Sequence, residues 1–408
     1  MGVAVKASNV LRPPRLRTDE ERSASWLELF FDLVFVVAIA QLGLVLADDL
    51  SPGGFARFFL LFVPVWWSWV GYTNYADRFD TDDPVFRGMM LAGMLGMAAL
   101  AVSVPDAFSG GSGAFALSYV GVRTVLILLY ERARRNVPAA RSLISVTMGV
   151  FVFGTALWVL SLLISEPWRF GLWGLALVVE GSTPWVARRA MASVPYHASH
   201  LPERYGLFTI IVLGESLVAV VLGVGGTDWG LASASASAGG FLIAACLWWV
   251  YFDFIELVDI KRTLLARNVF IYGHLIIALG LTTIGVGVKK AILYSGEPYL
   301  PAAGSWVLCG GTALFLTAIG LIYAVSTPSF GPYVLFARVG TAGVAVLLGV
   351  VGIAVPSTAL VGMLLVAMLM LVAFEVAQKT FQEEIPGPTA TCDQDTERPP
   401  NEQHDEDH

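Results

Sequence analysis

Charged residues are scarce in this sequence. Only 14% of its 408 residues are Asp, Glu, Lys or Arg, and 56% are apolar, whereas an average soluble domain has roughly 25% charged and about 45–50% apolar residues. This balance excludes a soluble multidomain enzyme and a disordered protein. The net charge of −7, with no basic domain, excludes a nucleic-acid-binding protein. The composition is that of an integral membrane protein.

Cysteine and catalytic motifs are also scarce. The three cysteines, Cys246, Cys309 and Cys392, are too few for a disulfide framework. His197 and His200 have no Cys or carboxylate at ligand spacing, so we expect no metal site there. The chain has no nucleotide-binding loop, no Gly-x-Ser-x-Gly and no His-Glu-x-x-His motif. We therefore expect no ATP-driven pump, no enzyme and no cofactor.

Long apolar runs are what the sequence does contain. A membrane-spanning helix needs about 20 apolar residues, and turn and charge signals separate runs of about that length. The sequence thus predicts an all-α, polytopic membrane protein with about twelve spans, near 26–47, 54–75, 88–104, 113–131, 142–164, 169–187, 205–224, 237–258, 269–288, 304–325, 333–353 and 357–378.

The distribution of Lys and Arg predicts the orientation of the chain in the cell membrane. With the N-terminus inside, the outer segments hold only Arg57, Arg169, Lys289 and Lys290, and nearly all other Lys and Arg residues lie in inner segments. By the positive-inside rule, both termini are cytoplasmic. Residues 1–24 then form a cytoplasmic N-terminal segment, and residues 382–408 form a disordered acidic cytoplasmic tail.

The sequence also contains signs of an internal repeat. Trp66-Trp67 recurs as Trp248-Trp249 at an offset of 182, and the segment from Asp32 to Val37 resembles the segment from Glu215 to Val220 at an offset of 183. Six helices per repeat place both copies in the same orientation, as in parallel-repeat transporters. We expect one six-helix repeat over residues 25–190 and a second over residues 200–378.

Ionisable side chains inside the predicted spans are the candidate functional residues, because each costs about 2.5–3.5 kcal/mol at the bilayer centre unless it faces a partner or water. We expect ion or substrate binding by carboxylates, since Arg123 and Arg338 are the only arginines within the spans and cannot neutralise them all. Arg204, at the edge of a span, is a third candidate counter-charge. The carboxylates are Glu28, Asp32, Glu180, Glu215, Asp253 and Glu256.

Three strings identify a family. They are Trp26-Leu27-Glu28-Leu29-Phe30-Phe31-Asp32-Leu33-Val34-Phe35, the acidic segment from Tyr75 to Asp83, and the segment from His200 to Ser216, which includes Leu213-Gly214-Glu215-Ser216. With these strings the sequence resembles the bacterial low temperature requirement protein A family over roughly residues 22–378. The family name records a growth phenotype in the cold, so the resemblance implies the fold and not a biochemical activity.

The first span is also similar to another signature. Glu28-x-Phe30-x-Asp32 resembles the first-helix Phe-Ser-Asp string of the endolysosomal and prokaryotic potassium-channel family, although Phe31 replaces the serine. In those channels six-helix units are used and first helices line the pore. By analogy, a homodimer of this chain would bring four first-type helices around one axis.

Three functions remain open. The first is a secondary transporter or ion channel for a small ion or solute, with Asp32 and Glu215 as matched sites in the two repeats. The second is a non-transporting scaffold or a cold- or lipid-responsive factor among the membrane lipids, in which the carboxylates are structural. The third, ranked last, is an intramembrane lipid enzyme that uses Asp253 and Glu256. The acidic loop from Asp77 to Asp83 either binds a divalent cation or, as we favour, caps a helix.

Overall fold

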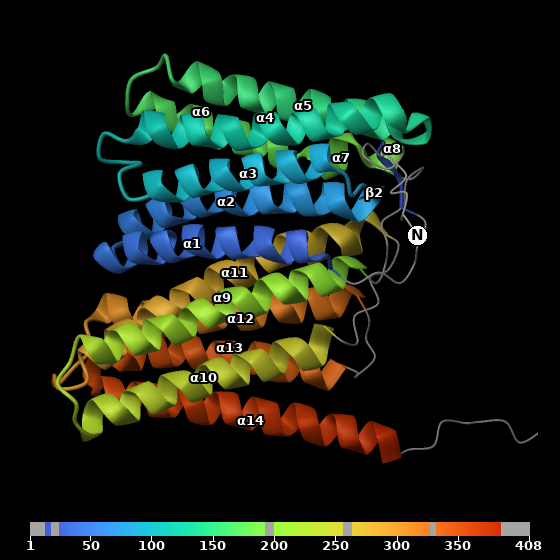
Figure 1. Ribbon diagram of the computed structural model, residues 1–408. Coiled ribbons are helices and arrows are strands. Elements are labelled where there is room, and N and C mark those ends of the chain that lie inside the picture. Colours follow the sequence, from blue (N-terminus) through green and yellow to red (C-terminus); the bar gives the residue numbers. More distant parts are fainter. Residues whose placement is uncertain (1–12, 18–23, 192–199, 256–262, 327–331, 385–408) are drawn as a thin grey trace, which may run out of the picture.

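The computed structural model describes residues 13–17, 24–191, 200–255, 263–326 and 332–384. Nearly all of these residues are helical (Figure 1). Residues 385–408 of the expected acidic tail, Glu256, and the loop with His197 lie outside the described residues.

The long helices are α1 (Trp26–Asp48), α2 (Pro52–Arg78), α3 (Pro84–Ser103), α4 (Ser112–Asn136), α5 (Arg141–Ser161), α6 (Trp168–Gly181), α9 (His200–Gly225), α10 (Leu231–Ile255), α11 (Leu264–Leu293), α12 (Ala302–Ser326), α13 (Pro332–Val351) and α14 (Ser357–Glu384).

Short elements connect these helices. The helices α7 (Thr183–Val186) and α8 (Arg188–Met191) follow α6. The 3₁₀ helix η2 (Pro138–Ala140) precedes α5, and the 3₁₀ helix η3 (Gly352–Ala354) follows α13. The strands β1 (Arg15–Leu16) and β2 (Phe79–Asp80) pair antiparallel, with Leu16 opposite Phe79. This pair holds the segment before α1 against the end of α2.

Each of the twelve predicted spans coincides with one long helix, which confirms the all-α membrane fold. Eleven helices of the described chain are long and apolar enough to cross a membrane. The sixth predicted span, 169–187, is different: α6 has 14 residues, so it is about 21 Å long and shorter than the hydrocarbon core. The chain turns after Gly181 because Pro184 in the next short helix has no N–H to donate.

Local sequence signals set where the long helices begin. Ser25 caps α1 in a capping box with Glu28, and Ser51 caps α2, with Pro52 in its first turn. Asp83 caps α3 by accepting a hydrogen bond from the backbone N–H of Phe86 at 2.8 Å. Of the two interpretations of the acidic loop before α3, this contact supports helix capping.

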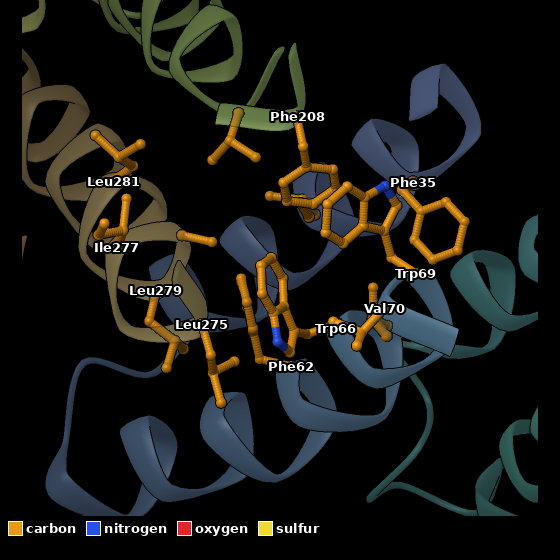
Figure 2. Close-up of a cluster of buried hydrophobic side chains, with 14 of the residues drawn as sticks. Phe35, Phe62, Trp66, Trp69, Val70, Phe208, Leu275, Ile277, Leu279 and Leu281 are labelled. Carbon is orange, nitrogen blue, oxygen red and sulfur yellow. The ribbon is translucent and has the colours of Figure 1, made fainter. Parts of the chain in front are cut away.

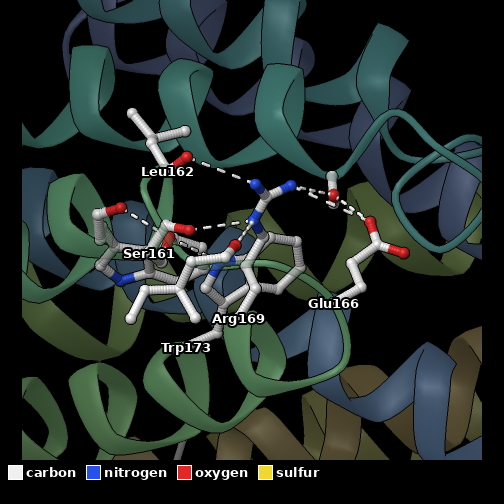
Figure 3. Close-up of polar contacts among 8 residues, drawn as sticks. Ser161, Leu162, Glu166, Arg169 and Trp173 are labelled. Atoms are coloured by element: carbon white, nitrogen blue, oxygen red, sulfur yellow. Dashed lines mark hydrogen bonds and ion pairs between the residues drawn. The ribbon is translucent and has the colours of Figure 1, made fainter.

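A polar cluster fixes the turn that leads into α6 (Figure 3). Arg169 donates to the backbone carbonyls of Ser161 at 2.9 Å and Ile164 at 3.1 Å, and also to the hydroxyl of Ser112 at the start of α4. The Trp173 indole N–H donates to the Ser161 hydroxyl at 3.1 Å. Arg169 thereby supplies donors to backbone carbonyls at the end of α5 and in the turn that follows it.

The helices form two groups that meet along α1, α2, α9 and α11 (Figure 1). In the first group α1 packs on α2 and α3, α3 on α4, α4 on α5 and α5 on α6. In the second group α9 packs on α10 and α11, α11 on α12, α12 on α13 and α13 on α14. In the second group α10 also packs on α14, a contact much larger than its counterpart between α2 and α6, and the repeat itself stays a prediction.

The first long helix begins, and the last one ends, at the same end of the bundle (Figure 1). We call this the proximal end and the opposite one the distal end. The prediction that the proximal end faces the cytoplasm rests on the Lys and Arg distribution alone.

Glycines allow α11 and α12 to approach closely. A Cβ atom on Gly287 would lie 2.5 Å from the Cα atom of Leu308. Gly280 and Gly311 face each other in the same contact, where added Cβ atoms would lie about 3 Å from backbone atoms of the other helix. Helices in lipid lack a hydrophobic driving force for association. Small residues at such positions allow the close van der Waals packing that holds the helices together instead.

We expect Gly287→Ala to destabilise the protein by about 1–3 kcal/mol, because the methyl group must push two backbones apart. Gly310→Ala is the matched control on α12, since a Cβ there meets nothing within 4 Å. Thermal unfolding of both purified variants in one detergent measures the effect. Equal unfolding temperatures for the two variants would contradict this description of the contact.

Candidate functional site

The candidate site is a buried cluster of one arginine and two carboxylates where the two groups of helices meet. Arg204 of α9 lies 2.8 Å from Asp32 and 3.3 Å from Glu28, both on α1. All three side chains are buried. The two carboxylates are four residues apart and therefore lie on one face of α1, toward α9. Arg204 is thus the counter-charge that the sequence suggested.

Hydrogen bonds hold the two carboxylates differently. Glu28 accepts a hydrogen bond from the backbone N–H of Ser25 at 2.9 Å, which ties it to the start of α1. Asp32, one turn deeper, accepts from the Trp69 indole N–H at 2.8 Å and from Arg204, both through Oδ1. Its Oδ2 atom is buried and has no hydrogen-bond partner among the described residues. Asp32 therefore retains an unused acceptor inside the bundle.

Two carboxyl groups share the Arg204 guanidinium in this cluster. Asp32, the deeper of the two, is fully buried, and an ionised carboxylate is costly away from water unless a partner offsets it. The cluster is therefore suited to hold a proton or a small cation beside Arg204.

Packed aromatic side chains lie next to the cluster, and Figure 2 shows Phe35, Trp66, Trp69 and Phe208 among them. The rings of Trp69 and Phe208 are 4.3 Å apart, and Trp66 packs edge-on against Phe208 at 5.4 Å. Phe35, one turn beyond Asp32 on α1, is fully buried beside them. This layer separates Asp32 from the distal half of the bundle.

A second buried polar group lies beside Tyr205, the residue after Arg204. The Tyr205 ring packs on Trp69 at 4.8 Å and on His274 at 4.8 Å. Nδ1 of His274 lies 2.7 Å from the backbone carbonyl of Phe270, which can only accept, so Nδ1 carries the proton. Nε2 of a neutral ring then accepts from the Tyr251 hydroxyl at 2.9 Å. A chain of packed polar rings thus joins α9, α10 and α11.

Cavities lie on both sides of the aromatic layer. At the proximal end a vestibule of about 650 Å³ is lined by Glu28, Arg17, Asp82 and Arg87, among others. In the distal half a small cavity of about 40 Å³ lies between α1, α9 and α11, and Glu215 lines it. The second cavity has room for one or a few water molecules.

The structure does not bring Asp32 and Glu215 together. Asp32 lies in the proximal part of the α1–α9 contact, and Glu215 lies eleven residues beyond Arg204 on α9, or about 16 Å along its axis. Glu215 is partly exposed, and Lys289 of α11 lines the same cavity. Glu215 therefore faces a small cavity, whereas Asp32 is buried and lines neither of the two cavities.

Glu180 forms a buried ion pair inside the first group of helices. It lies at the end of α6 and accepts hydrogen bonds from Arg123 and from the Tyr119 hydroxyl, both on α4. All three side chains are fully buried. Gly154 of α5 packs against the Glu180 side chain, where a Cβ atom would lie 2.5 Å away. The pair therefore connects α4 to α6, and α5 packs against it through Gly154.

The remaining predicted residues lie near the proximal end of the second group. Arg338 of α13 pairs with Glu375 of α14 through two hydrogen bonds of 2.7 and 3.0 Å. Asp253 accepts from the Trp249 indole N–H at 2.8 Å and lies 3.6 Å from the Lys379 amine. Glu256 lies outside the described residues, so its expected pairing with Asp253 stays a prediction.

Comparison with known proteins agrees with these sequence features. Residues 23–374 match the family described as bacterial low temperature requirement A protein (LtrA). The chain belongs to this family. It is also 31% identical over 338 residues to an uncharacterized protein from Rhizobium meliloti (strain 1021), an alignment that covers 77% of this chain and 80% of that protein. The family assignment confirms the resemblance seen in the sequence.

In this LtrA protein Arg204, which hydropathy places at the edge of a span, is as deeply buried as Arg123 and Arg338. Sequence reasoning missed Glu375, the partner of Arg338. A signal was available, because Glu375 lies inside the last predicted span, 357–378.

We expect Glu180→Gln to destabilise the LtrA protein by about 3–5 kcal/mol, because it leaves the Arg123 guanidinium buried without a counter-charge. Asp82→Asn is the matched control and should change stability little, since the Asp82–Arg87 pair is exposed. Reversible unfolding in mixed micelles measures both. If Glu180→Gln unfolds like wild type, the pair does not hold α4 and α6 together.

Proposed function

We propose that this LtrA protein is a secondary transporter in which proton or cation binding at Glu28 and Asp32 competes with their ion pairs to Arg204. The observation that carries the proposal is the position of Arg204. It lies on the second group of helices and binds both carboxylates of the first. A proton or cation that neutralises these carboxylates weakens a charged contact between the two groups.

The access to the cluster supports transport. Glu28 lines the proximal vestibule, whereas Asp32, one turn deeper, is fully buried behind it. The aromatic layer around Trp69 and Phe208 then separates Asp32 from the distal cavity with Glu215. A site that is open toward one end and closed toward the other is what alternating access requires of one of its states.

The exposure of α1 favours a path within one chain over a pore between chains. Its outward face carries Phe30, Leu33 and Val37, each at least half exposed, and Asp32 lies on the opposite, buried face. A pore lined by this outward face in a homodimer would contain apolar side chains and no Asp32. In the potassium channels that the first span resembles, first helices line the pore. That arrangement does not place Asp32 in a pore here.

Flux measurements test the proposal. In proteoliposomes with an imposed pH gradient, we expect wild-type protein to move protons, ²²Na⁺ or ⁸⁶Rb⁺ faster than protein-free vesicles. Asp32→Asn should reduce that flux at least tenfold, because it removes the carboxylate bound to Arg204. Asp82→Asn, a change of an exposed carboxylate that lines the same vestibule, should leave it intact.

Gel filtration and thermal unfolding show whether Asp32→Asn still folds. If it does not, Glu28→Gln takes its place, because Glu28 shares the same arginine and lies beside the vestibule. Equal fluxes for wild type and for Asp32→Asn combined with Glu215→Gln would refute the assignment.

The alternative function is a non-transporting membrane scaffold or a cold- or lipid-responsive factor. The observation that favours it is that Asp32, Glu180 and Glu375 each pair with an arginine in a buried contact between helices. In that case the same substitutions lower the unfolding temperature, and no probe ion crosses faster than through protein-free vesicles.

A further inference from the structure

An apolar groove of about 610 Å³ lies at the proximal part of α11 and α12, next to the short helix α7. Its volume is within the range of about 300–1,000 Å³ that is usual for small-molecule sites. Trp185, Leu265 and Leu321 are more than half exposed along it. Because α11 and α12 are membrane-spanning helices, the groove opens toward the lipid. The other lining residues are Leu264, Asn268, Val269, Tyr272, Gly273, Ile276, Leu314, Thr317 and Ala318.

The break after α6 creates one wall of this groove. The Tyr272 hydroxyl donates to the backbone carbonyl of Gly181, where α6 ends. Trp185, just after the break, stacks on the Tyr272 ring at 5.5 Å, and Trp67 stacks on Tyr272 at 5.8 Å. Trp185 is therefore held at the side of α11 by defined contacts.

One polar side chain in the groove has an unused hydrogen-bonding group. Asn268 is only 5% exposed, it lines the groove, and its Oδ1 atom has no hydrogen-bond partner among the described residues. A buried amide without a partner costs free energy in an apolar environment. A ligand with an apolar chain and a polar group at one end could fill the groove and donate a hydrogen bond to Asn268.

Positive charge lies at the proximal side of the groove. Arg188 and Arg189 of α8 are exposed and follow Trp185 by three and four residues. The contact of 3.0 Å between the Arg267 guanidinium and the sulfur of Met191 fastens α8 to the first turns of α11. Two exposed arginines beside an apolar groove complement a phosphate group attached to acyl chains.

We propose that the groove binds one anionic phospholipid, with an acyl chain along α11 and α12 and the headgroup near Arg188 and Arg189. Asn268 Oδ1 accepts a hydrogen bond from a hydroxyl group of the lipid headgroup, since the glycerol ester region itself has only acceptors. This site is separate from the Arg204 cluster and does not depend on the transport proposal.

Native mass spectrometry of the full chain tests the site, with phosphatidylglycerol and phosphatidylcholine as probes. We expect wild type to retain one phosphatidylglycerol more tightly than phosphatidylcholine. Thr317→Trp, at an exposed position in the groove, should abolish this retention by filling the space. The control Leu347→Trp, at an exposed apolar position on α13, should retain the lipid as wild type does.

The headgroup contact has its own test. Arg188→Gln with Arg189→Gln should weaken phosphatidylglycerol binding by about fivefold per arginine and leave phosphatidylcholine unchanged. Arg134→Gln with Arg135→Gln, another exposed pair of neighbouring arginines, is the control. Equal affinities for the two double variants overturn the headgroup assignment.

Two other results overturn the groove assignment. One is equal lipid retention by Thr317→Trp and Leu347→Trp. The other is loss of a dimer mass, instead of a lipid mass, in Thr317→Trp, because the groove would then be an interface between two copies of this chain.

Discussion

An ionised side chain within a membrane needs a partner, and this constraint organises the bundle. Arg123 with Glu180 and Arg338 with Glu375 are pairs within one group of helices each, and they join α4 to α6 and α13 to α14. Arg204 differs because it binds carboxylates of the other group. The first two pairs stabilise each group internally. Within the described part of the chain, the Arg204 cluster is a buried charged contact that depends on how the two groups sit together.

Much of the fold could be predicted from the sequence, because local signals determine it. Apolar length predicts the eleven helices of the described chain that are long enough to span a membrane, and Ser25 and Asp83 start helices as side-chain caps. The sixth predicted span is instead the short α6 with a break before Pro184. The pairing of the charged residues was harder to predict. Arg204 and Asp32 are 172 residues apart, and their contact depends on helix packing that no local pattern encodes. Hydropathy also treats a residue at the edge of a span as exposed, although Arg204 is buried.

The matched positions of the expected repeat have different surroundings. Asp32 faces an arginine and a tryptophan, whereas Glu215 faces a small cavity with Lys289. In a symmetric pair, both carboxylates would have similar affinity for a proton or cation. Here burial and counter-charge differ between the two positions, so packing has given different surroundings to residues that the sequence alone would treat as equivalent.

Tyr272 connects the lipid-facing groove to the contact between the two groups. Its ring lies between Trp67 of α2 and Trp185 of α7, and its hydroxyl binds the end of α6. His274, two residues further along α11, packs on Tyr205 beside Arg204. A lipid that fills the groove would restrain Trp185 and therefore Tyr272. Because the same segment of α11 contacts both the groove and the rings next to Arg204, groove occupancy would favour the arrangement in which the two groups are in contact.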